Sequence, residues 1–284
     1  PAMKRLLLLL ALGAATACGD SEPRPLGVMT LNMRYDNPED GPDNWRFRRE
    51  RIAGLIRTRK PDLLGTQELL ANQFDDLRAA LPDYRAVGVG REDGVRAGEF
   101  NAVFFRDGTF DLLDSGTFWL SEEPGRAGSK GWDGACERLA TWVVLRRGSD
   151  GREFLFINTH LDHEGETARR EGVALLRQRI DSLRGDRPVI LTGDFNAEPD
   201  SPVIAHVGED GFLRDARLAA AERSGPAWSF SDFGRIPEAE RPLLDYIFIG
   251  GGIRAVRCEV LPDTLGGGYL SDHAPVAATL EFNR

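Results

Sequence analysis

Carboxylate, carboxamide and imidazole side chains recur directly after apolar, strand-like runs of this sequence. The runs lead into short motifs such as TLNM, GTQE and LTGDFN, and the same arrangement occurs again further along the chain. The residues concerned are Asn32, Glu68, His160, Asp194, Asn196, Asp245, Asp272 and His273. Because side chains that follow strands emerge at the edge of a sheet, we expect these groups to converge. One or two could be ordinary turn residues, but six clusters in one chain indicate a functional site.

The histidines strengthen this expectation. Three of the four, His160, His163 and His273, fall within these motifs, and only His206 lies elsewhere. No serine or cysteine nucleophile stands in a recognisable motif beside them. Histidines next to carboxylates therefore indicate an activated water molecule rather than a covalent intermediate.

The acidic and amide residues could also hold a metal ion. Asn32, Glu68, Asp194 and Asp272 offer oxygen atoms and no thiolates, which suits Mg²⁺, with Mn²⁺ or Ca²⁺ as alternatives. Zinc is less favoured, because the chain has no His-x-His or HExxH motif. A hard cation beside cationic donors stabilises the negative charge that develops on a phosphoryl group. The residue types thus predict metal-assisted hydrolysis of a phosphoester.

The elements that must position these residues are mostly strands. Three helices are expected, at 45–59, 71–81 and 166–183, and the strand candidates are 27–32, 63–66, 102–106, 141–146, 154–159, 189–192, 246–249 and 276–282. Several strands follow one another without a helix, which favours packed sheets with helices outside them. No break in composition and no repeat divides the chain, so we expect one catalytic domain over 26–284.

Composition and charge set weaker limits. The 284 residues carry 36 Lys and Arg against 45 Asp and Glu, a net charge of −9, which argues against binding nucleic acid by bulk charge. A local cationic groove remains compatible with this balance. Almost every basic residue is arginine, which suits bidentate phosphate contacts or reflects compositional bias. Cys136 and Cys258 could pair in an oxidising compartment, although two separate thiols are the favoured interpretation.

The first residues have the pattern of an export signal. A short basic start precedes an apolar run and the small-residue exit ATA, which predicts a signal peptide over 1–17. Cys18 follows directly and resembles the lipidated cysteine of a bacterial lipoprotein, although ordinary cleavage is the alternative. Residues 19–25 read as a polar tether. We therefore expect an exported protein that is either attached to a membrane by a lipid at Cys18 or secreted.

The ordered motifs resemble those of one known superfamily. TLNM, TQE, NTHLDH, GDFN, LDYIF and SDHAPV occur in the order typical of the endonuclease/exonuclease/phosphatase superfamily, over residues 26–282. The chain is most similar to its secreted bacterial members. The resemblance implies a DNase-like α/β fold, a four-layer sandwich of two packed mixed β-sheets flanked by helices. It also implies a metal-dependent phosphoesterase.

The resemblance also assigns roles to the motif residues. Glu68 would be the principal metal carboxylate, with Asn32 and Asp272 as further metal ligands. His273, oriented by Asp245, would contact the phosphate or transfer a proton. The remaining implied catalytic residues are Asp194, which positions or deprotonates water or serves the leaving group, together with Asn196, His160 and Glu99. Glu99 would pair with His160 and favour the protonated form of that histidine.

Three further residues are candidates for binding substrate. Arg138 resembles an arginine that makes a bidentate phosphate contact, and its alternative is a surface arginine at the start of a strand. Asn101 and His163 lie beside motif residues and are expected around the substrate. The long loop 120–136 is expected to form part of the pocket rim, where Trp132 and the preceding Trp119 could stack on a sugar, an inositol or a base.

The substrate stays open at this level. The expected partner is a phosphorylated small molecule, a lipid-linked phosphoester or a nucleic-acid phosphodiester, bound by a monomer. An extracellular nonspecific endonuclease is the main alternative. A non-catalytic envelope-binding module is a remote one, because all the implied catalytic residues are present.

Overall fold

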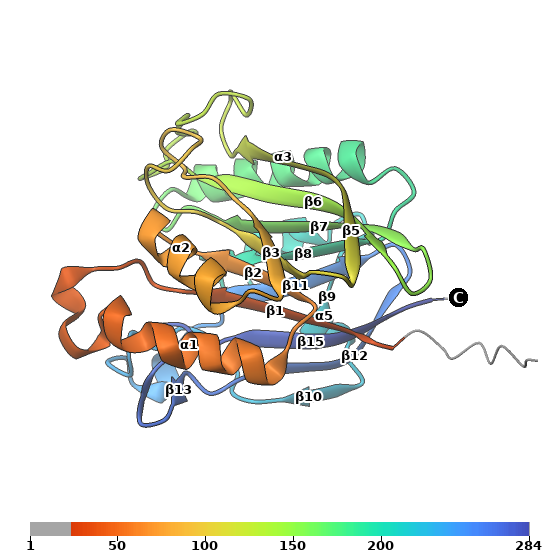
Figure 1. Cartoon of the computed structure of the whole chain (residues 1–284). Coiled ribbons are helices and arrows are strands. Elements are labelled where there is room, and N and C mark those ends of the chain that lie inside the picture. Colours follow the sequence, from red (N-terminus) through yellow and green to blue (C-terminus); the bar gives the residue numbers. More distant parts are fainter. Residues whose placement is uncertain (1–23, 284) are drawn as a thin grey trace, which may run out of the picture.

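Two β-sheets lie face to face, with helices on both outer sides (Figure 1). The computed structural model describes residues 24–283, so the predicted signal peptide and Cys18 lie outside the described residues. One sheet has seven strands in the order β10-β12-β15-β1-β2-β4-β3, and the other has six in the order β5-β6-β7-β8-β11-β9. Both sheets are mixed, because β1 pairs in parallel with β2 and β7 with β8 while their other neighbours run antiparallel. The predicted α/β sandwich is confirmed.

The strands that carry the motifs lie in the middle of each sheet. The bounds of all strands are β1 Leu26–Asn32, β2 Leu63–Gln67, β3 Tyr84–Val87, β4 Val103–Arg106, β5 Phe110–Trp119, β6 Leu139–Arg147, β7 Glu153–His160, β8 Val189–Asp194, β9 Arg214–Asp215, β10 Glu222–Ser224, β11 Asp245–Gly250, β12 Ile253–Val260, β13 Thr264–Leu265, β14 Gly268–Tyr269 and β15 Val276–Phe282. Strands β5 and β12 are long, and the sequence interpretation had missed both of them.

The helices form where the apolar spacing placed them. Helix α1 (Trp45–Arg59) starts at Asn44, whose side chain accepts a hydrogen bond from the Arg46 N–H, and it ends at Lys60 in the left-handed conformation. Helix α2 (Ala71–Ala80) and helix α3 (Glu166–Arg184) match the predicted ranges to within a residue. The shorter helices are α4 (Pro202–Val207), α5 (Ala216–Ala219), η1 (Pro38–Asp43) and η2 (Glu238–Glu240). None of the helices in the described part of the chain has the length and apolar character needed to cross a bilayer.

Two hydrophobic clusters hold the layers together. The larger one contains most of the apolar side chains of the six-stranded sheet, including Phe156, Ile157 and Leu191, together with the inner face of α3. The smaller one packs α1 and α2 against the seven-stranded sheet through residues such as Ile56 and Phe74. The thiols of Cys136 and Cys258 are free, as the favoured interpretation expected.

A row of buried polar side chains joins the two sheets beside the larger cluster. We call Thr30, Gln67, Asn158 and Thr192 the polar seam; all four are fully buried. The Gln67 amide donates to Asn158 Oδ1 at 2.6 Å and to Thr30 Oγ1 at 3.1 Å, while Thr192 Oγ1 donates to Asn158 Oδ1 at 3.1 Å. The sheets approach closely at Gly65, where an added Cβ would lie 2.2 Å from Thr192 Oγ1. The seam therefore fixes the position of one sheet relative to the other.

Candidate active site

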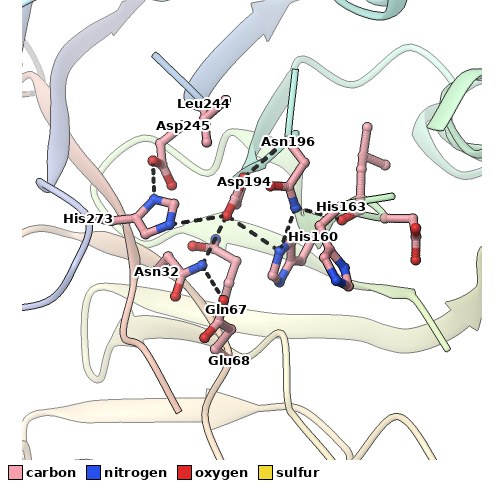
Figure 2. A network of polar contacts seen from close by, with 12 residues as sticks. Asn32, Gln67, Glu68, His160, His163, Asp194, Asn196, Leu244, Asp245 and His273 are labelled. Atoms are coloured by element: carbon pink, nitrogen blue, oxygen red, sulfur yellow. Dashed lines mark hydrogen bonds and ion pairs between the residues drawn. The ribbon is translucent and has the colours of Figure 1, made fainter. Parts of the chain in front are cut away.

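The predicted site residues meet at one edge of both sheets. Asn32 ends β1, and Glu68 directly follows β2, which pairs with β1 in the seven-stranded sheet. In the six-stranded sheet, His160 ends β7 opposite Asp194 at the end of β8, and Asp245 starts β11 opposite the same aspartate. Figure 2 shows these side chains pointing toward one another across the gap between the two sheets.

Asp194 occupies the centre of this network. Its Oδ2 atom accepts a hydrogen bond from Asn32 Nδ2 at 3.0 Å and lies 3.4 Å from His160 Nε2 and 3.7 Å from His273 Nε2 (Figure 2). Its Oδ1 atom accepts the Asn196 N–H at 2.9 Å. Burial, followed by the negative charge of Asp245, raises the pKa of Asp194 to about 7. A carboxylate with such a pKa is suited to accept a proton near neutral pH.

The backbone around the site is strained. Arg34, Glu68 and Asn196 have positive φ angles of 52°, 62° and 45°, a backbone conformation that residues other than glycine rarely adopt. Local hydrogen bonds hold these turns: Asn32 Oδ1 accepts the Arg34 N–H at 2.9 Å, and Glu68 Oε2 accepts the Tyr35 N–H at 3.2 Å. Strain of this kind is kept where it places functional side chains.

His273 and Asp245 form a buried ion pair. His273 Nδ1 lies 2.8 Å from Asp245 Oδ2, which also accepts the Ser229 hydroxyl at 2.7 Å, and the ring of Phe230 lies 4.8 Å from the imidazole. Burial alone would lower the pKa of His273, but the charges of Asp245 and Asp194 raise it well above the ordinary 6.5. Asp245 thus contacts Nδ1 of His273, and Nε2 of the same ring is directed toward Asp194.

Replacing Asp245 with asparagine should therefore change the pH profile. A group with a raised pKa is protonated below that pKa, so removing the Asp245 charge lowers the pKa of His273 and its proton is lost at a lower pH. We expect the alkaline limb of the kcat–pH profile of D245N to move to lower pH by about one unit or more. S229A removes the hydrogen bonds of the Ser229 hydroxyl with Asp245 and with the Leu244 N–H but keeps the Asp245 charge, so it should move the limb less. An unchanged alkaline limb in D245N would contradict this role of the pair.

The contacts of His160 differ from those that the sequence predicted. Glu99 was predicted to pair with it and favour its protonated form, but the contacts of His160 are with Asn196 Nδ2 at 3.0 Å and with Asp194. Burial, followed by the positive charge of Arg138, lowers the pKa of His160 well below 6.5. His160 is therefore neutral and accepts a hydrogen bond at Nε2 from Asn196. Its buried Nδ1 has no hydrogen-bond partner in the described chain.

Glu99 pairs with an arginine that the sequence interpretation had not singled out. Its Oε2 lies 2.6 Å from Arg91 Nη1. Burial, followed by the charge of Glu68, raises the pKa of Glu99 to about 7. No hydrogen bond or ion pair joins Glu99 to His160 among the described residues, and its charged partner is Arg91.

The arrangement fits a divalent cation. Glu68 offers an oxygen within 4.8 Å of ligand atoms of His160 and Asp194. Burial raises the pKa of the Asp272 carboxyl, and the negative charge of Glu68 raises it further. Buried carboxylates that repel one another are stabilised by a cation. Asn32, Glu68 and Asp272, the predicted ligands, lie around this acidic region together with Asp194, and their atoms are the hard oxygen donors that Mg²⁺ prefers.

Arg34 is the site residue that sequence reasoning missed. Its guanidinium makes two hydrogen bonds to Asp40, both at 3.0 Å, and Nη1 lies 3.7 Å from Asp272 Oδ2. Burial alone would lower its pKa, but Asp40, Asp272 and Glu68 raise it, so Arg34 stays charged. The only signal in the sequence was its place two residues after Asn32.

Arg138 is buried, so the alternative of a surface arginine is wrong. Its Nη2 lies 2.9 Å from His163 Nδ1, and its Nε lies 3.6 Å from Asp162 Oδ2. The Asp162 carboxylate also accepts the backbone N–H groups of Ala135 at 3.0 Å and Gly165 at 2.8 Å, so it joins two loops beneath Arg138. His163 is half exposed at the rim.

Of the other residues expected to contact substrate, two make contacts within the protein and one is partly exposed. Asn101 donates its amide to the Leu139 carbonyl at 2.8 Å, which gives it a structural contact beside the site. Trp119 is buried and donates to the Arg91 carbonyl at 2.6 Å, so it cannot stack on a ligand as expected. Trp132 is partly exposed and remains available.

Comparisons with known proteins agree with the geometry. A family model described as the Endonuclease/Exonuclease/phosphatase family matches residues 29–273. An endonuclease/exonuclease/phosphatase from Bacteroides vulgatus has 40% identity and a TM-score of 0.89, and the match covers 92% of this chain and 100% of that one. A mannosyl-6-phosphatase from Bacteroides thetaiotaomicron has 35% identity and a TM-score of 0.85, covering 90% of this chain and 100% of that one.

The curated relatives are more distant. Human nocturnin is 25% identical over 308 residues, covering 94% of this chain and 67% of nocturnin. The exoribonuclease subunit Ccr4 of Emericella nidulans is 31% identical over 136 residues, covering 42% of this chain. The matches span 20% of that Ccr4 subunit and 26% of Drosophila nocturnin, so they cover a minor part of these relatives.

Proposed function

Because the chain belongs to the endonuclease/exonuclease/phosphatase family, whose members are phosphoester hydrolases, we propose that it is a Mg²⁺-dependent phosphatase acting on a phosphorylated sugar. The observation that carries the proposal is the buried centre formed by Asp194, His160 and His273, with acidic groups on one side and Arg34 and Arg138 nearby. Such a centre is suited to a compact anionic group with developing negative charge.

The proposed chemistry assigns one task to each residue of the centre. Asn32, Glu68 and Asp272 would hold the cation, which would supply charge neutralisation and Lewis acidity at the phosphoryl group. Asp194, whose pKa is raised, accepts a proton from the attacking water as the water oxygen bonds to phosphorus; the bond from phosphorus to the sugar oxygen breaks, and that oxygen takes a proton from solvent water. His273, held by Asp245, donates a hydrogen bond from Nε2 to a phosphoryl oxygen. Asn196 orients His160, and Arg138 can contact the phosphate from the opposite rim.

The sugar phosphate is favoured over a nucleic acid for two reasons. The similarity to a mannosyl-6-phosphatase extends over that entire chain at 35% identity, whereas the match to Ccr4 covers a small part of that exoribonuclease. Part of the positive charge on α1 is also compensated, because Arg49 lies 3.5 Å from Asp76 and Arg59 lies 3.3 Å from Glu259. A nonspecific nuclease needs uncompensated positive charge along the phosphate backbone.

A substrate panel tests this proposal. Chelated, purified protein would be supplied with Mg²⁺, Mn²⁺ or Ca²⁺ and offered hexose 6-phosphates, a bis-aryl phosphodiester, DNA and RNA. We expect phosphate release from a sugar monoester at a kcat/KM at least about tenfold above that for the diester, and loss of activity in a chelator. Degradation of DNA or RNA without phosphate release from any monoester would replace the proposal with the nuclease alternative.

A further inference from the structure

A groove of about 660 Å³ lies beside the site, between the loop that connects β5 to β6 and the outer face of α3. In Figure 1 this loop rises next to α3, at the top of the molecule. The residues of the groove that carry the argument are Glu122, Trp132, Glu171, Leu175, Gln178 and Arg179. None of them belongs to the catalytic network.

Trp132 is held in place before any ligand arrives. Its φ angle is 48°, and its backbone N–H donates to the two carboxylate oxygens of Glu122 at 3.1 and 3.3 Å. The next residue, Asp133, accepts the Ala168 N–H at 2.7 Å and so fastens the loop to the first turn of α3. Because the loop backbone at Trp132 is already ordered, presenting the indole ring to a ligand costs little conformational freedom of the loop, which favours a recognition role.

The lining of the groove selects a neutral, hydroxyl-rich ligand. Trp132 and Leu175 supply apolar surface, while Glu122, Gln178 and Arg179 supply hydrogen-bond acceptors and donors side by side. The Glu171 carboxylate is paired with Arg170 at 2.8 Å, which leaves Glu122 against Arg179, so the groove offers no excess of positive charge to attract a phosphodiester chain. A purely apolar segment would cover these charged groups without giving them partners. A carbohydrate offers both C–H faces for the indole ring and hydroxyl groups for the polar side chains.

The groove also has the right direction for an extended substrate. His163, which contacts Arg138, lies three residues before α3 begins at Glu166. At 1.5 Å per residue, Glu171 lies about 8 Å and Ser182 about 24 Å along the helix axis from that start. The groove therefore starts near the rim that carries His163 and continues away from the phosphate site.

We propose that this groove binds the carbohydrate portion of a phosphorylated oligosaccharide whose phosphate reaches the catalytic centre. This inference rests on the proposed sugar phosphatase activity and extends it from a monosaccharide to a glycan. Trp132 stacks on a sugar ring, and Gln178 and Arg179 hydrogen-bond its hydroxyl groups.

Binding of unphosphorylated trisaccharides tests the groove without catalysis. Mannotriose, cellotriose and maltotriose would be titrated into the full chain, with calorimetry as the readout. We expect one of them to bind, W132A to weaken it at least about tenfold, W132F to retain it within about threefold, and Q178A to weaken it severalfold. Because Gln178 is exposed, Q178A tests the groove even if W132A fails to fold. The inference is overturned if no trisaccharide binds, or if W132A and Q178A both bind the trisaccharide as tightly as the wild type does.

Hydrolysis separates this inference from the proposed function. W132A should hydrolyse a hexose 6-phosphate like the wild type but lose the wild type's preference for a phosphorylated trisaccharide. If the wild type binds a trisaccharide at Trp132 yet hydrolyses no sugar phosphate, the proposed function is wrong, and the inference that the groove binds carbohydrate is kept. If it hydrolyses hexose 6-phosphates with no preference for the longer substrate and binds no trisaccharide, the groove fails alone.

Discussion

H273A should lower kcat by about a hundredfold to ten-thousandfold, the range for a lost group that assists proton transfer or stabilises charge at a reacting centre. His273 is buried, its Nδ1 is held 2.8 Å from Asp245, and its Nε2 lies 3.7 Å from Asp194. No neighbouring side chain can replace it, because His160 is bound to Asn196 and is kept neutral by its surroundings. Initial rates of phosphate release at saturating substrate measure the loss.

The matched control for this variant is H206A. His206 lies on α4, where it contacts Glu209 and Arg177 away from the site, so its removal should leave kcat within about twofold of the wild type. Thermal unfolding of both variants separates catalysis from folding. Retention of most wild-type activity by folded H273A would remove His273 from the mechanism.

E68Q is the second variant for which we expect a large loss of activity. Glu68 contributes charge to the acidic region shared with Asp194 and Asp272, and glutamine keeps its size while removing that charge. We expect kcat/KM at low Mg²⁺ to fall at least about a hundredfold, because a cation loses several kcal/mol of attraction when a carboxylate ligand is neutralised. A metal titration followed by activity measures both the affinity and the maximal rate.

The metal dependence distinguishes a ligand from a residue that only supports the fold. If Glu68 holds the cation, raising Mg²⁺ should recover part of the E68Q activity, and calorimetry of Mg²⁺ binding should show the same loss of affinity. E50Q, on the exposed face of α1, serves as the control and should titrate like the wild type. An E68Q protein with an unchanged Mg²⁺ dependence would exclude Glu68 as a metal ligand.

The sequence predicted the site because its residues follow strands. Asn32, Glu68, His160 and Asp194 stand at the C-terminal ends of parallel neighbours, where strand direction alone brings them to one edge. The central strands were equally clear, since they are continuous apolar runs. The exposed edge strand β5 was missed because Asp111, Asp114 and Gly116 interrupt its apolar pattern. The alternation in IRAVRCEV could have revealed β12.

The errors arise where a contact depends on loops. Glu99 precedes a strand, as the resemblance suggested, but the loop 91–99 folds back on itself and brings Arg91, rather than His160, into contact with Glu99. Trp119 ends β5 pointing inward, and strand register rather than residue type decided that orientation. Arg34 reaches Asp272 only because its own φ angle is positive, at 52°, which turns the chain after Asn32. No periodic pattern encodes such turns.

The polar seam has a consequence for how such a protein can evolve. Gln67 of one sheet and Asn158 of the other are bonded at 2.6 Å, one residue before Glu68 and two before His160. The two halves of the catalytic centre are thereby tied together deep in the interior, independently of the loops at the rim. The part of the loop between β5 and β6 that precedes Asp133 can therefore accumulate substitutions, insertions and new recognition residues, while the contacts of Asp133, Ala135 and Arg138 at its end are kept. Selection for a new substrate acts on the rim, and the seam preserves the ability to catalyse throughout that divergence.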